Sequence, residues 1–257
     1  MTILDTIIQH KYIEVAKRKL HTPIEQLQQS LLYQQPRLSL IKALQQPQAT
    51  GIIAEFKRKS PSKGFINQNA DAATVTTGYA AAGASALSVL TDELFFGGTT
   101  ADLLAARVNQ IPILRKDFIV DAYQIEEAKA MGADVILLIA ACLTPIEVKN
   151  LAQYAKQIGL EVLLELHDET ELQHVCEDTV LVGINNRNLK TFEVDIAAAI
   201  NMSQLIGADK IKIAESGISE KATLQRFKAA GYKGFLIGEN FMKTNDPAAA
   251  LQSFINN

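Results

Sequence analysis

The sequence has little of the chemistry that holds metals or builds disulfide frameworks. It contains no tryptophan, four histidines and two cysteines, Cys142 and Cys176, which lie far apart and form no C-x-x-C motif. That pattern indicates neither a disulfide framework nor a zinc site, so we expect both thiols to be reduced core residues. The histidines fall at no metal-ligand spacing, and we therefore predict no bound metal.

Long apolar runs and a strong excess of one charge are also missing. No run approaches the ~20 apolar residues of a membrane span, and the N-terminus lacks the basic and apolar segments of a secretory signal. The formal net charge of −3 predicts neither a nucleic-acid partner nor a basic membrane-binding face. We therefore expect a cytoplasmic protein. Its basic residues recur singly near the ends of apolar segments, which favours a small anionic ligand.

What the sequence does contain is a regular alternation that begins at Gly51. Short apolar segments predict eight strands: Ile52–Phe56, Ala86–Leu90, Ile113–Lys116, Val135–Ile139, Val162–Leu166, Leu181–Asn185, Lys210–Ala214 and Gly234–Ile237. Amphipathic segments predict a helix after each strand: Ala70–Ala82, Thr99–Val108, Ala122–Met131, Pro145–Ile158, Glu169–Val175, Val194–Met202, Glu220–Ala230 and Pro247–Ile255. Strict alternation indicates parallel strands joined by right-handed crossovers.

This pattern favours a closed (β/α)8 TIM barrel over an open sheet. An open dinucleotide-binding sheet requires a G-x-G-x-x-G motif after its first strand, and none follows Ile52–Phe56. A barrel of this kind typically has about 250 residues, so the 257 residues suit one α/β domain. We expect residues 49–257 to form the barrel and residues 1–48 to form an N-terminal helical extension packed on it.

The extension is predicted to contain three helices. Apolar residues recur near a helical period from Ile3 to Val15. Thr22-Pro23-Ile24-Glu25 resembles an N-cap, a first-turn proline and a capping-box glutamate, which predicts a second helix through about Tyr33. Pro36 and Pro47 enclose a third, short helix. The segment is too short to hold a core of its own.

Charged and amide side chains gather at the predicted strand ends, where active sites of such barrels lie. These residues are Glu55, Lys57, Lys116, Glu165, Asn185, Arg187 and Glu215. Glu55 and Lys57 are two residues apart, so on a strand they point to one face with Cα atoms roughly 7 Å apart. Lys116 is expected to point inward, with Arg115 and Asp117 facing away. The alternative is a ring of structural ion pairs, but such a ring has no reason to be confined to one rim.

Small-residue turns follow the last two predicted strands. Ser216-Gly217 and Gly238-Glu239 bring backbone N–H groups to the positions where this fold often binds phosphate, and Ser60 in the first loop adds a hydroxyl. Plain turn glycines are the alternative for each. Together with the rim residues, these turns indicate a phosphorylated small molecule and acid–base chemistry by lysine and carboxylate.

Several of these segments resemble indole-3-glycerol-phosphate synthase, in order along the chain. They are Ile-Ala-Glu-Phe-Lys-Arg-Lys-Ser-Pro-Ser (53–62), Leu-Thr-Asp-Glu-Leu-Phe-Phe-Gly-Gly (90–98), Leu-Arg-Lys-Asp-Phe-Ile-Val-Asp (114–121), Leu-Leu-Glu-Leu-His (163–167), Gly-Ile-Asn-Asn-Arg-Asn-Leu (183–189), Ala-Glu-Ser-Gly-Ile (214–218) and Leu-Ile-Gly-Glu (236–239). The resemblance implies a cofactor-free ring closure of 1-(2-carboxyphenylamino)-1-deoxyribulose 5-phosphate to indole-3-glycerol phosphate in tryptophan biosynthesis, with loss of carbon dioxide and water. It also implies a helical segment over the barrel mouth. We expect a monomer or weak homodimer.

The resemblance further implies roles for individual residues. Lys116 would be the general acid that polarises the ketone, and Glu165 would serve the later dehydration with help from Lys57. Lys57 would also bind the substrate carboxylate, and Glu55 would hold and tune the lysines. Whether the carboxylates or the neighbouring lysine dominate the pKa of Lys116 is left open by the sequence.

The remaining roles concern binding. Asn185 and Arg187 would orient sugar hydroxyls and neighbouring carboxylates, and Glu215 and Ser216 would complete a polar floor. The resemblance implies that Phe96 and Phe118 enclose the aromatic ring of the substrate between them, with ordinary core packing as the alternative. It also implies that the phosphate is bound by Ser60, Gly217, Gly238 and Glu239. Glu239 stands where some relatives have serine. If a backbone N–H binds the phosphate there, the side chain matters little, and if a hydroxyl does, that contact is lost. Two other functions stay open: a sugar-phosphate isomerase and a catalytically inactive scaffold barrel.

Overall fold

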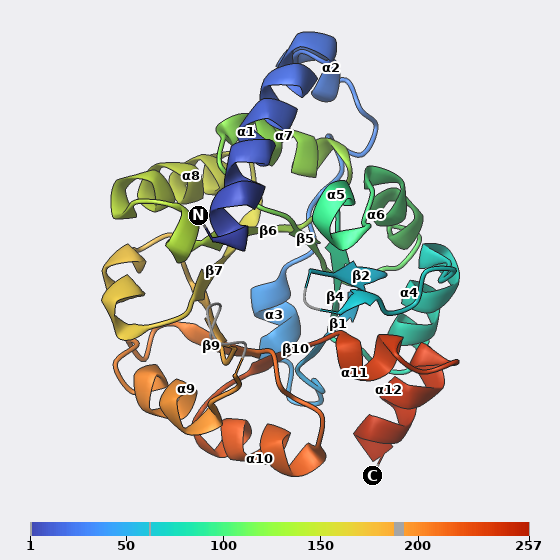
Figure 1. Cartoon of the computed structure of the whole chain (residues 1–257), viewed down its shortest axis with the longest axis vertical. Coiled ribbons are helices and arrows are strands. Elements are labelled where there is room, and N and C mark those ends of the chain that lie inside the picture. The colour runs from blue at the N-terminus through green and yellow to red at the C-terminus, as the bar shows by residue number, and fades with distance from the viewer. Residues whose placement is uncertain (1, 62, 188–192, 257) are drawn as a thin grey trace.

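Eight parallel strands form a closed barrel in the computed structural model, which describes residues 2–61, 63–187 and 193–256 (Figure 1). Around the barrel the order is β1, β10, β9, β8, β7, β6, β5, β4, and β4 pairs again with β1. The strands are β1 (Ile52–Phe56), β4 (Ala86–Leu90), β5 (Ile113–Lys116), β6 (Val135–Ile139), β7 (Glu161–Leu166), β8 (Leu181–Asn185), β9 (Ile211–Glu215) and β10 (Gly234–Ile237). Three residues of the sequence motifs, Ser62, Asn188 and Leu189, lie outside the described residues.

The predicted TIM barrel and its strands are therefore confirmed. Six of the strands have the predicted bounds, and β7 begins one residue earlier. The exception is the predicted strand Lys210–Ala214, which runs from Ile211 to Glu215. Glu215 consequently belongs to the strand, where pairing of Asn185 with Glu215 fixes its position on the rim.

Helices surround the barrel, mostly where they were predicted. They are α4 (Ala72–Ala81), α6 (Thr100–Ala106), α7 (Ala122–Ala130), α8 (Pro145–Gln157), α9 (Ile196–Ser203), α10 (Lys221–Ala229) and α12 (Pro247–Asn256). The predicted helix at 169–175 is the 3-10 helix η2 (Glu169–His174). The sequence analysis missed the hairpin of β2 (Lys59–Ser60) and β3 (Gly64–Phe65) and the short helices α5 (Glu93–Phe96), η1 (Ala140–Cys142) and α11 (Glu239–Met242).

The alternation of side chains along each strand divides the core into two layers. Residues such as Ile52 and Ala54 face the surrounding helices, and residues such as Ile53, Leu114 and Leu163 fill the barrel interior. Toward the carboxyl ends of the strands, the next interior-facing positions are occupied by the charged residues of the rim. The apolar layers thus support a polar layer at the end of the barrel where active sites of this fold lie.

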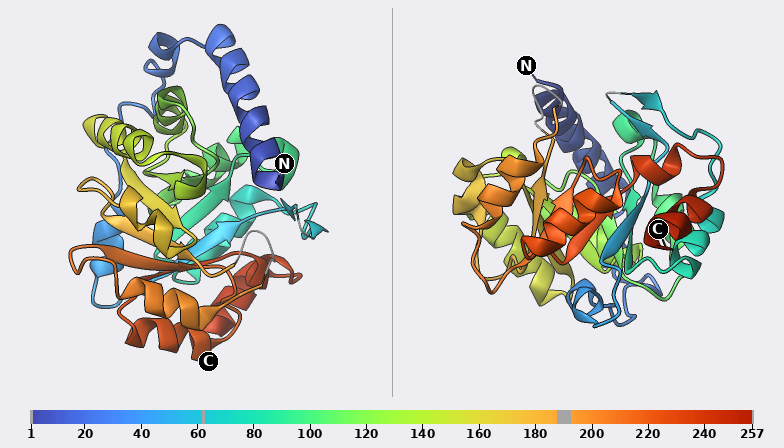
Figure 2. Two further views of the ribbon diagram at one scale, coloured as in Figure 1. Left: turned by 60° about the vertical axis from the view of Figure 1, so that its left-hand side comes forward. Right: turned by 90° about the horizontal axis from the view of Figure 1, so that it is seen from below.

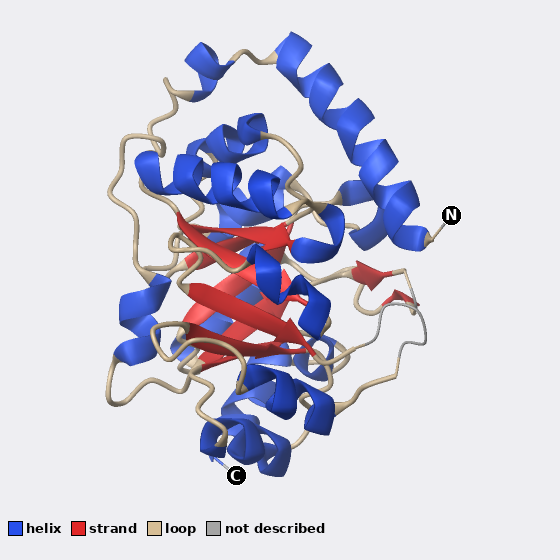
Figure 3. Cartoon of the chain, turned by 90° about the vertical axis from the view of Figure 1, so that its left-hand side faces the viewer, coloured by secondary structure: helices blue, strands red, loops and turns tan. Residues whose placement is uncertain are grey.

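The N-terminal extension occupies both ends of the barrel. The helix α1 (Ile3–His21) lies beside the carboxyl ends of the strands, at the same end as the β2–β3 hairpin (Figure 2). The helix α3 (Leu40–Gln45) lies at the opposite end (Figure 3), where Leu40 and Leu44 join the apolar barrel interior. Ser39 and the backbone N–H of Ile41 donate hydrogen bonds to Glu161 at the start of β7, which fixes α3 there.

One prediction for the extension is wrong. The second helix, α2, spans only Ile24–Leu27, and it has no side-chain cap because its N-cap residue is Pro23 and not Thr22. Thr22 instead ends α1, where its backbone N–H donates a hydrogen bond to the carbonyl of Arg18 at 2.8 Å. Tertiary contacts replace the remaining helical turns. Ser30 donates to the carbonyl of Ala130 at 2.8 Å, and the hydroxyl of Tyr33 donates to Glu126 on α7 at 2.6 Å. Among the described residues, no helix is long and apolar enough to cross a membrane.

Candidate active site

A cavity of about 550 Å³ opens at the carboxyl ends of the strands. Every residue that the sequence analysis assigned to the site lines it, so the fold brings them together as predicted. Their individual roles stay predictions. The cavity wall also includes Ile3, Leu4 and Ile7 of α1, which the sequence analysis placed only on an apolar helix face.

Glu55 and Lys57 form a pair at the end of β1. The Nζ atom of Lys57 lies 2.7 Å from Oε1 of Glu55, and the glutamate is the more deeply buried of the two. Gly238, at the end of the neighbouring strand β10, leaves room for this carboxylate, because a Cβ atom at Gly238 would lie 2.5 Å from Oε1 of Glu55. The small residue at position 238 therefore has a structural reason that the sequence analysis did not contain.

Lys116 lies at the centre of the polar layer. Its Nζ is 3.0 Å from Oε2 of Glu165 and 3.8 Å from Oε2 of Glu215. Burial acts to lower the pKa of the Lys116 ammonium, but the carboxylates of Glu165, Glu215 and Glu55 outweigh it and raise this pKa above its usual value. The carboxylates therefore dominate the pKa of Lys116, and this side chain is a cation at neutral pH.

The pKa values of the two carboxyl groups next to Lys116 are shifted in opposite directions. Burial raises the pKa of Glu165, but the charge of Lys116, His167 and a 3.0 Å hydrogen bond from Asn185 bring it well below its usual value. Burial and the nearby charge of Glu165 raise the pKa of Glu215, against the smaller effect of Lys116. Glu165 is therefore ionised while Glu215 tends to hold a proton. Such a separation marks groups suited to base and acid roles.

His167 is a site residue that the sequence analysis set aside. It lies two residues after Glu165, on the same face of β7 extended, and its Nε2 is 3.1 Å from Oε1 of Glu165. Its Nδ1 is 3.5 Å from Glu171, so the ring stands between two carboxylates at ion-pair distance without an aligned hydrogen bond. Burial lowers its pKa, but Glu165 and Glu171 raise it to about 10. Its spacing of two residues from Glu165 was the sequence signal that could have placed His167 in the site.

The turn after β9 has an unusual backbone. Ser216 adopts a φ of 66°, and among the described residues it is the one non-glycine with positive φ. A left-handed residue with a side chain costs roughly 1–2 kcal/mol, so the surrounding structure must hold it. Asn186, which the sequence analysis did not single out, donates its side-chain N–H to the carbonyl of Ser216 at 2.8 Å.

Two further elements close the predicted phosphate region. The buried hydroxyl of Ser60 has no hydrogen-bond partner among residues 2–61, 63–187 and 193–256. Lys63, in the β2–β3 hairpin, lies 2.5 Å from Glu239 at the start of α11 and joins the first loop to the last. Burial raises the pKa of Glu239, but Lys63 brings it below its usual value, so this carboxylate is ionised and neutralised by the lysine.

The two aromatic rings of the cavity are in contact with each other. Phe96 and Phe118 have ring centroids 5.8 Å apart and planes tilted by 40°. A third ring between two others needs a separation of about 7 Å, so the predicted sandwich requires the two rings to move apart.

Metal ligands are not assembled here, since in the part of the chain that the structure describes no three His, Cys, Asp or Glu side chains could hold an ion together.

Comparison with known sequences identifies a family. The family model described as indole-3-glycerol phosphate synthase matches residues 4–254. The indole-3-glycerol phosphate synthase of Bacteroides thetaiotaomicron is 47% identical over 254 residues, covering 98% of this chain and 97% of the relative. That of Burkholderia vietnamiensis is 46% identical over 254 residues, covering 97% of each chain.

Comparison with solved structures concerns the fold alone. A chain from the tryptophan synthase α2β2 complex of Pyrococcus furiosus matches with a TM-score of 0.59 at 14% identity, covering 80% of this chain and 96% of that chain. The 3-hexulose-6-phosphate synthase of Salmonella typhimurium matches with a TM-score of 0.62 at 12% identity, covering 80% and 97%. Both are similar to this chain in their barrel architecture.

Proposed function

Because the chain belongs to the indole-3-glycerol phosphate synthase family, we propose that the polar rim of its barrel performs the family reaction with Lys116 as the first acid. That reaction is the ring closure of 1-(2-carboxyphenylamino)-1-deoxyribulose 5-phosphate to indole-3-glycerol phosphate, catalysed by a decarboxylating carbon–carbon lyase of tryptophan biosynthesis. The observation that carries the assignment of roles is the 3.0 Å pair of Lys116 and Glu165 at the centre of the rim.

The first step forms a bond between the ring carbon that bears the carboxylate and the ketone carbon. The ketone oxygen gains negative charge and must receive a proton. Lys116 suits this step through its charge, because its raised pKa keeps it protonated and a fixed positive charge stabilises the oxyanion. The same raised pKa makes it a weaker acid, so the proton moves to the oxygen only as negative charge develops there. Carbon dioxide then leaves from the ring carbon, which restores the electrons of the aromatic system.

The last step removes water and needs one acid and one base. The lowered pKa of Glu165 keeps its carboxylate ionised, so it is free to accept a proton from the intermediate as the base. Lys57 would first bind the substrate carboxylate and, once carbon dioxide has left, would protonate the departing hydroxyl. Glu55 holds Lys57 at 2.7 Å for both tasks. Asn185 orients Glu165 through its 3.0 Å hydrogen bond.

The other cavity residues would bind and position the substrate. Glu215 in its protonated form would donate a hydrogen bond in the polar floor with Ser216, and Arg187 would orient the sugar hydroxyls. Phe96 and Phe118 would contact the aromatic ring. The phosphate would lie between the hydroxyl of Ser60 and the backbone at Gly217, Gly238 and Glu239, and the Lys63–Glu239 pair supports a backbone rather than side-chain contact at the last position.

We also propose that residues 1–257 form one domain, because α1 and α3 contribute to the cavity wall and the barrel interior.

For the assembly and its location we propose a monomer or weak homodimer in the cytoplasm. The two cysteines, Cys142 and Cys176, are free, which supports a reducing compartment. Sedimentation at several protein concentrations tests the oligomeric state.

The test of the reaction is direct. Purified protein is mixed with the carboxyphenylamino-deoxyribulose phosphate, and indole fluorescence and released carbon dioxide are followed together. We expect one carbon dioxide for each indole product. An isomerase barrel would change the sugar without releasing carbon dioxide, and an inactive scaffold would bind substrate without turnover. Either result would overturn the proposal.

A further inference from the structure

We propose that Lys11, on the N-terminal helix α1, is a positioning residue that fixes the two aromatic rings of the cavity through Asp92 and Asp117. The inference rests on the proposed function, in which those rings contact the aromatic part of the substrate. Neither the proposed reaction nor the sequence motifs assign Lys11 a role.

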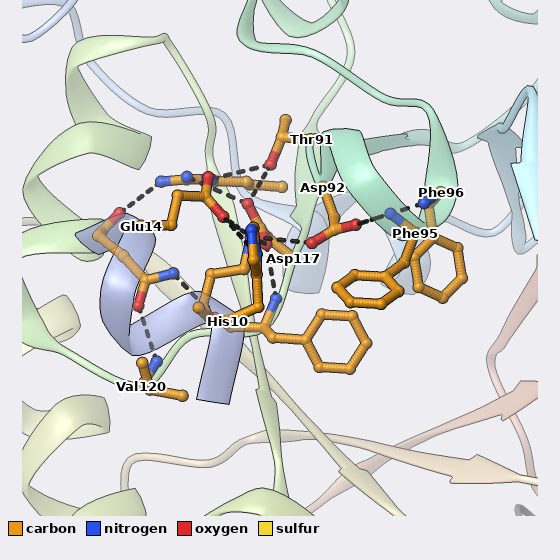
Figure 4. A network of polar contacts seen from close by, with 12 residues as sticks. His10, Glu14, Thr91, Asp92, Phe95, Phe96, Asp117 and Val120 are labelled. Carbon is orange, nitrogen blue, oxygen red and sulfur yellow. Dashed lines mark hydrogen bonds and ion pairs between the residues drawn. The ribbon is translucent and has the colours of Figure 1, made fainter. Parts of the chain in front are cut away.

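Lys11 extends from α1 into a cluster of three carboxylates, two of them buried. Its side chain is 0% exposed, and its Nζ lies 3.0 Å from Oδ2 of Asp92, 3.0 Å from Oδ1 of Asp117 and 2.8 Å from Oε2 of Glu14. Figure 4 shows Glu14 of α1 beside Asp92 and Asp117 of the barrel loops. A buried cation is stable only where several anions compensate its lost hydration, and these three do so.

The two aspartates hold the backbone of the segments that carry the rings. Oδ1 of Asp92 accepts hydrogen bonds from the N–H of Phe95 at 2.8 Å and of Phe96 at 3.3 Å, which caps α5. Oδ1 of Asp117 accepts a hydrogen bond from the backbone N–H of Phe118 at 2.8 Å. One ammonium therefore contacts both carboxylates, and each carboxylate fixes a ring-bearing backbone segment.

The barrel side of the cluster is rigid. Oδ2 of Asp117 accepts a hydrogen bond from Thr91 at 2.6 Å and lies 3.2 Å from Arg115, and all three residues are buried. Burial raises the pKa of Asp117, but Arg115 and Lys11 together bring it down to about 2, so the carboxylate is ionised. Removing Lys11 would therefore take away the one cation that joins the carboxylates of Asp92 and Asp117, and the two backbone segments would no longer be held in a fixed relation beneath the rings.

The experiment compares two ligands that differ in the aromatic part. Indole-3-glycerol phosphate carries a ring and a phosphate, and glycerol 3-phosphate carries the phosphate without the ring. We expect Lys11→Met to weaken binding of indole-3-glycerol phosphate roughly tenfold, the value of one aromatic contact, and to leave glycerol 3-phosphate unchanged. The substrate KM should rise in parallel, with a smaller change in kcat.

Lys19→Met is the matched control. Lys19 also joins α1 to the barrel, through Asp121 at 2.7 Å, but it forms no ion pair with Glu14, Asp92 or Asp117. Its loss should remove one attachment of α1 and leave both affinities unchanged. If Lys11→Met and Lys19→Met weaken the two ligands alike, or if Lys11→Met changes neither affinity, Lys11 only tethers the helix and the inference is overturned.

Two further variants keep the test decisive. Phe96→Ala must itself weaken the indole ligand; if it does not, the proposed ring contact fails, which is a failure of the proposed function and not of the inference. If Lys11→Met does not fold, Asp92→Asn replaces it. Its amide oxygen still caps Phe95 and Phe96, so we expect it to fold and to weaken the indole ligand several-fold through the lost ion pair. Wild-type affinity in that variant overturns the inference.

Discussion

Gly183 of β8 leaves the space that the carboxylate of Glu215 on β9 occupies: a Cβ atom at position 183 would lie 2.1 Å from Oε1 of Glu215. No larger residue fits there without moving the glutamate. The same carboxylate lies 3.8 Å from Lys116 through its other oxygen. A glycine in the middle of a strand is thus explained by a cavity-lining side chain on the next strand.

We expect Gly183→Ala to reduce kcat about tenfold or more, because the displaced Glu215 no longer meets the polar layer in the same geometry. Steady-state kinetics and thermal unfolding should be measured together. Gly159→Ala is the control: Gly159 has a φ of 86° and open space around it. That variant should lose roughly 1 kcal/mol of stability and keep its activity. A stable Gly183→Ala protein with normal kcat would contradict the prediction.

Lys116→Met should reduce turnover by roughly 10² to 10⁴, the usual contribution of a positioned acid, and leave the fold intact. The fold survives because Glu165 and Glu215 can share a proton once the cation is gone. Circular dichroism and kinetics with the synthase substrate check both parts. Lys156→Met, which removes an exposed partner of Asp178, serves as the control. Near-normal turnover would remove Lys116 from the first step.

Glu165→Gln should slow the reaction after the first bond has formed, because the lost base is needed for removal of water. Rapid mixing should then show carbon dioxide released about ten times or more faster than indole fluorescence appears. Glu161→Gln is the control, since Glu161 begins the same strand and binds Ser39 and Ile41 at the opposite end of the barrel. An unchanged rate of indole formation would exclude Glu165 from the mechanism.

His167 should make stability depend on pH in a defined window. Its pKa is raised from 6.5 to about 10 in the folded protein, so its contribution is complete below 6.5 and is lost as pH rises through 10. The loss of unfolding free energy in His167→Asn should therefore be largest near pH 6, on the order of a few kcal/mol, and should shrink toward pH 10. Urea unfolding at several pH values checks this, with exposed His21→Asn as the control. A difference that does not vary with pH would mean that His167 is neutral.

The strands and the rim were predictable because they depend on local periodicity. Alternation placed Ile53 inside the barrel, and the same alternation placed Glu55 and Lys116 on its rim. The length of α2 was not predictable, because Tyr33 donates a hydrogen bond to Glu126, which is distant in sequence, and no local signal marks that contact. Lys11 was missed for the same reason, since a lysine on a helix is usually exposed and here is fully buried by partners distant in sequence.

By itself the sequence determined the order of strands and helices, the barrel, the family and the set of residues that gather at one rim, since each depends on neighbours along the chain or on the succession of motifs. Only the tertiary structure decided their chemical states. Lys116 is held protonated, Glu165 ionised and Glu215 prone to hold a proton because each pKa reflects burial and the charges of other strands. Electrostatic energy depends on distances between groups far apart in sequence, and folding sets those distances.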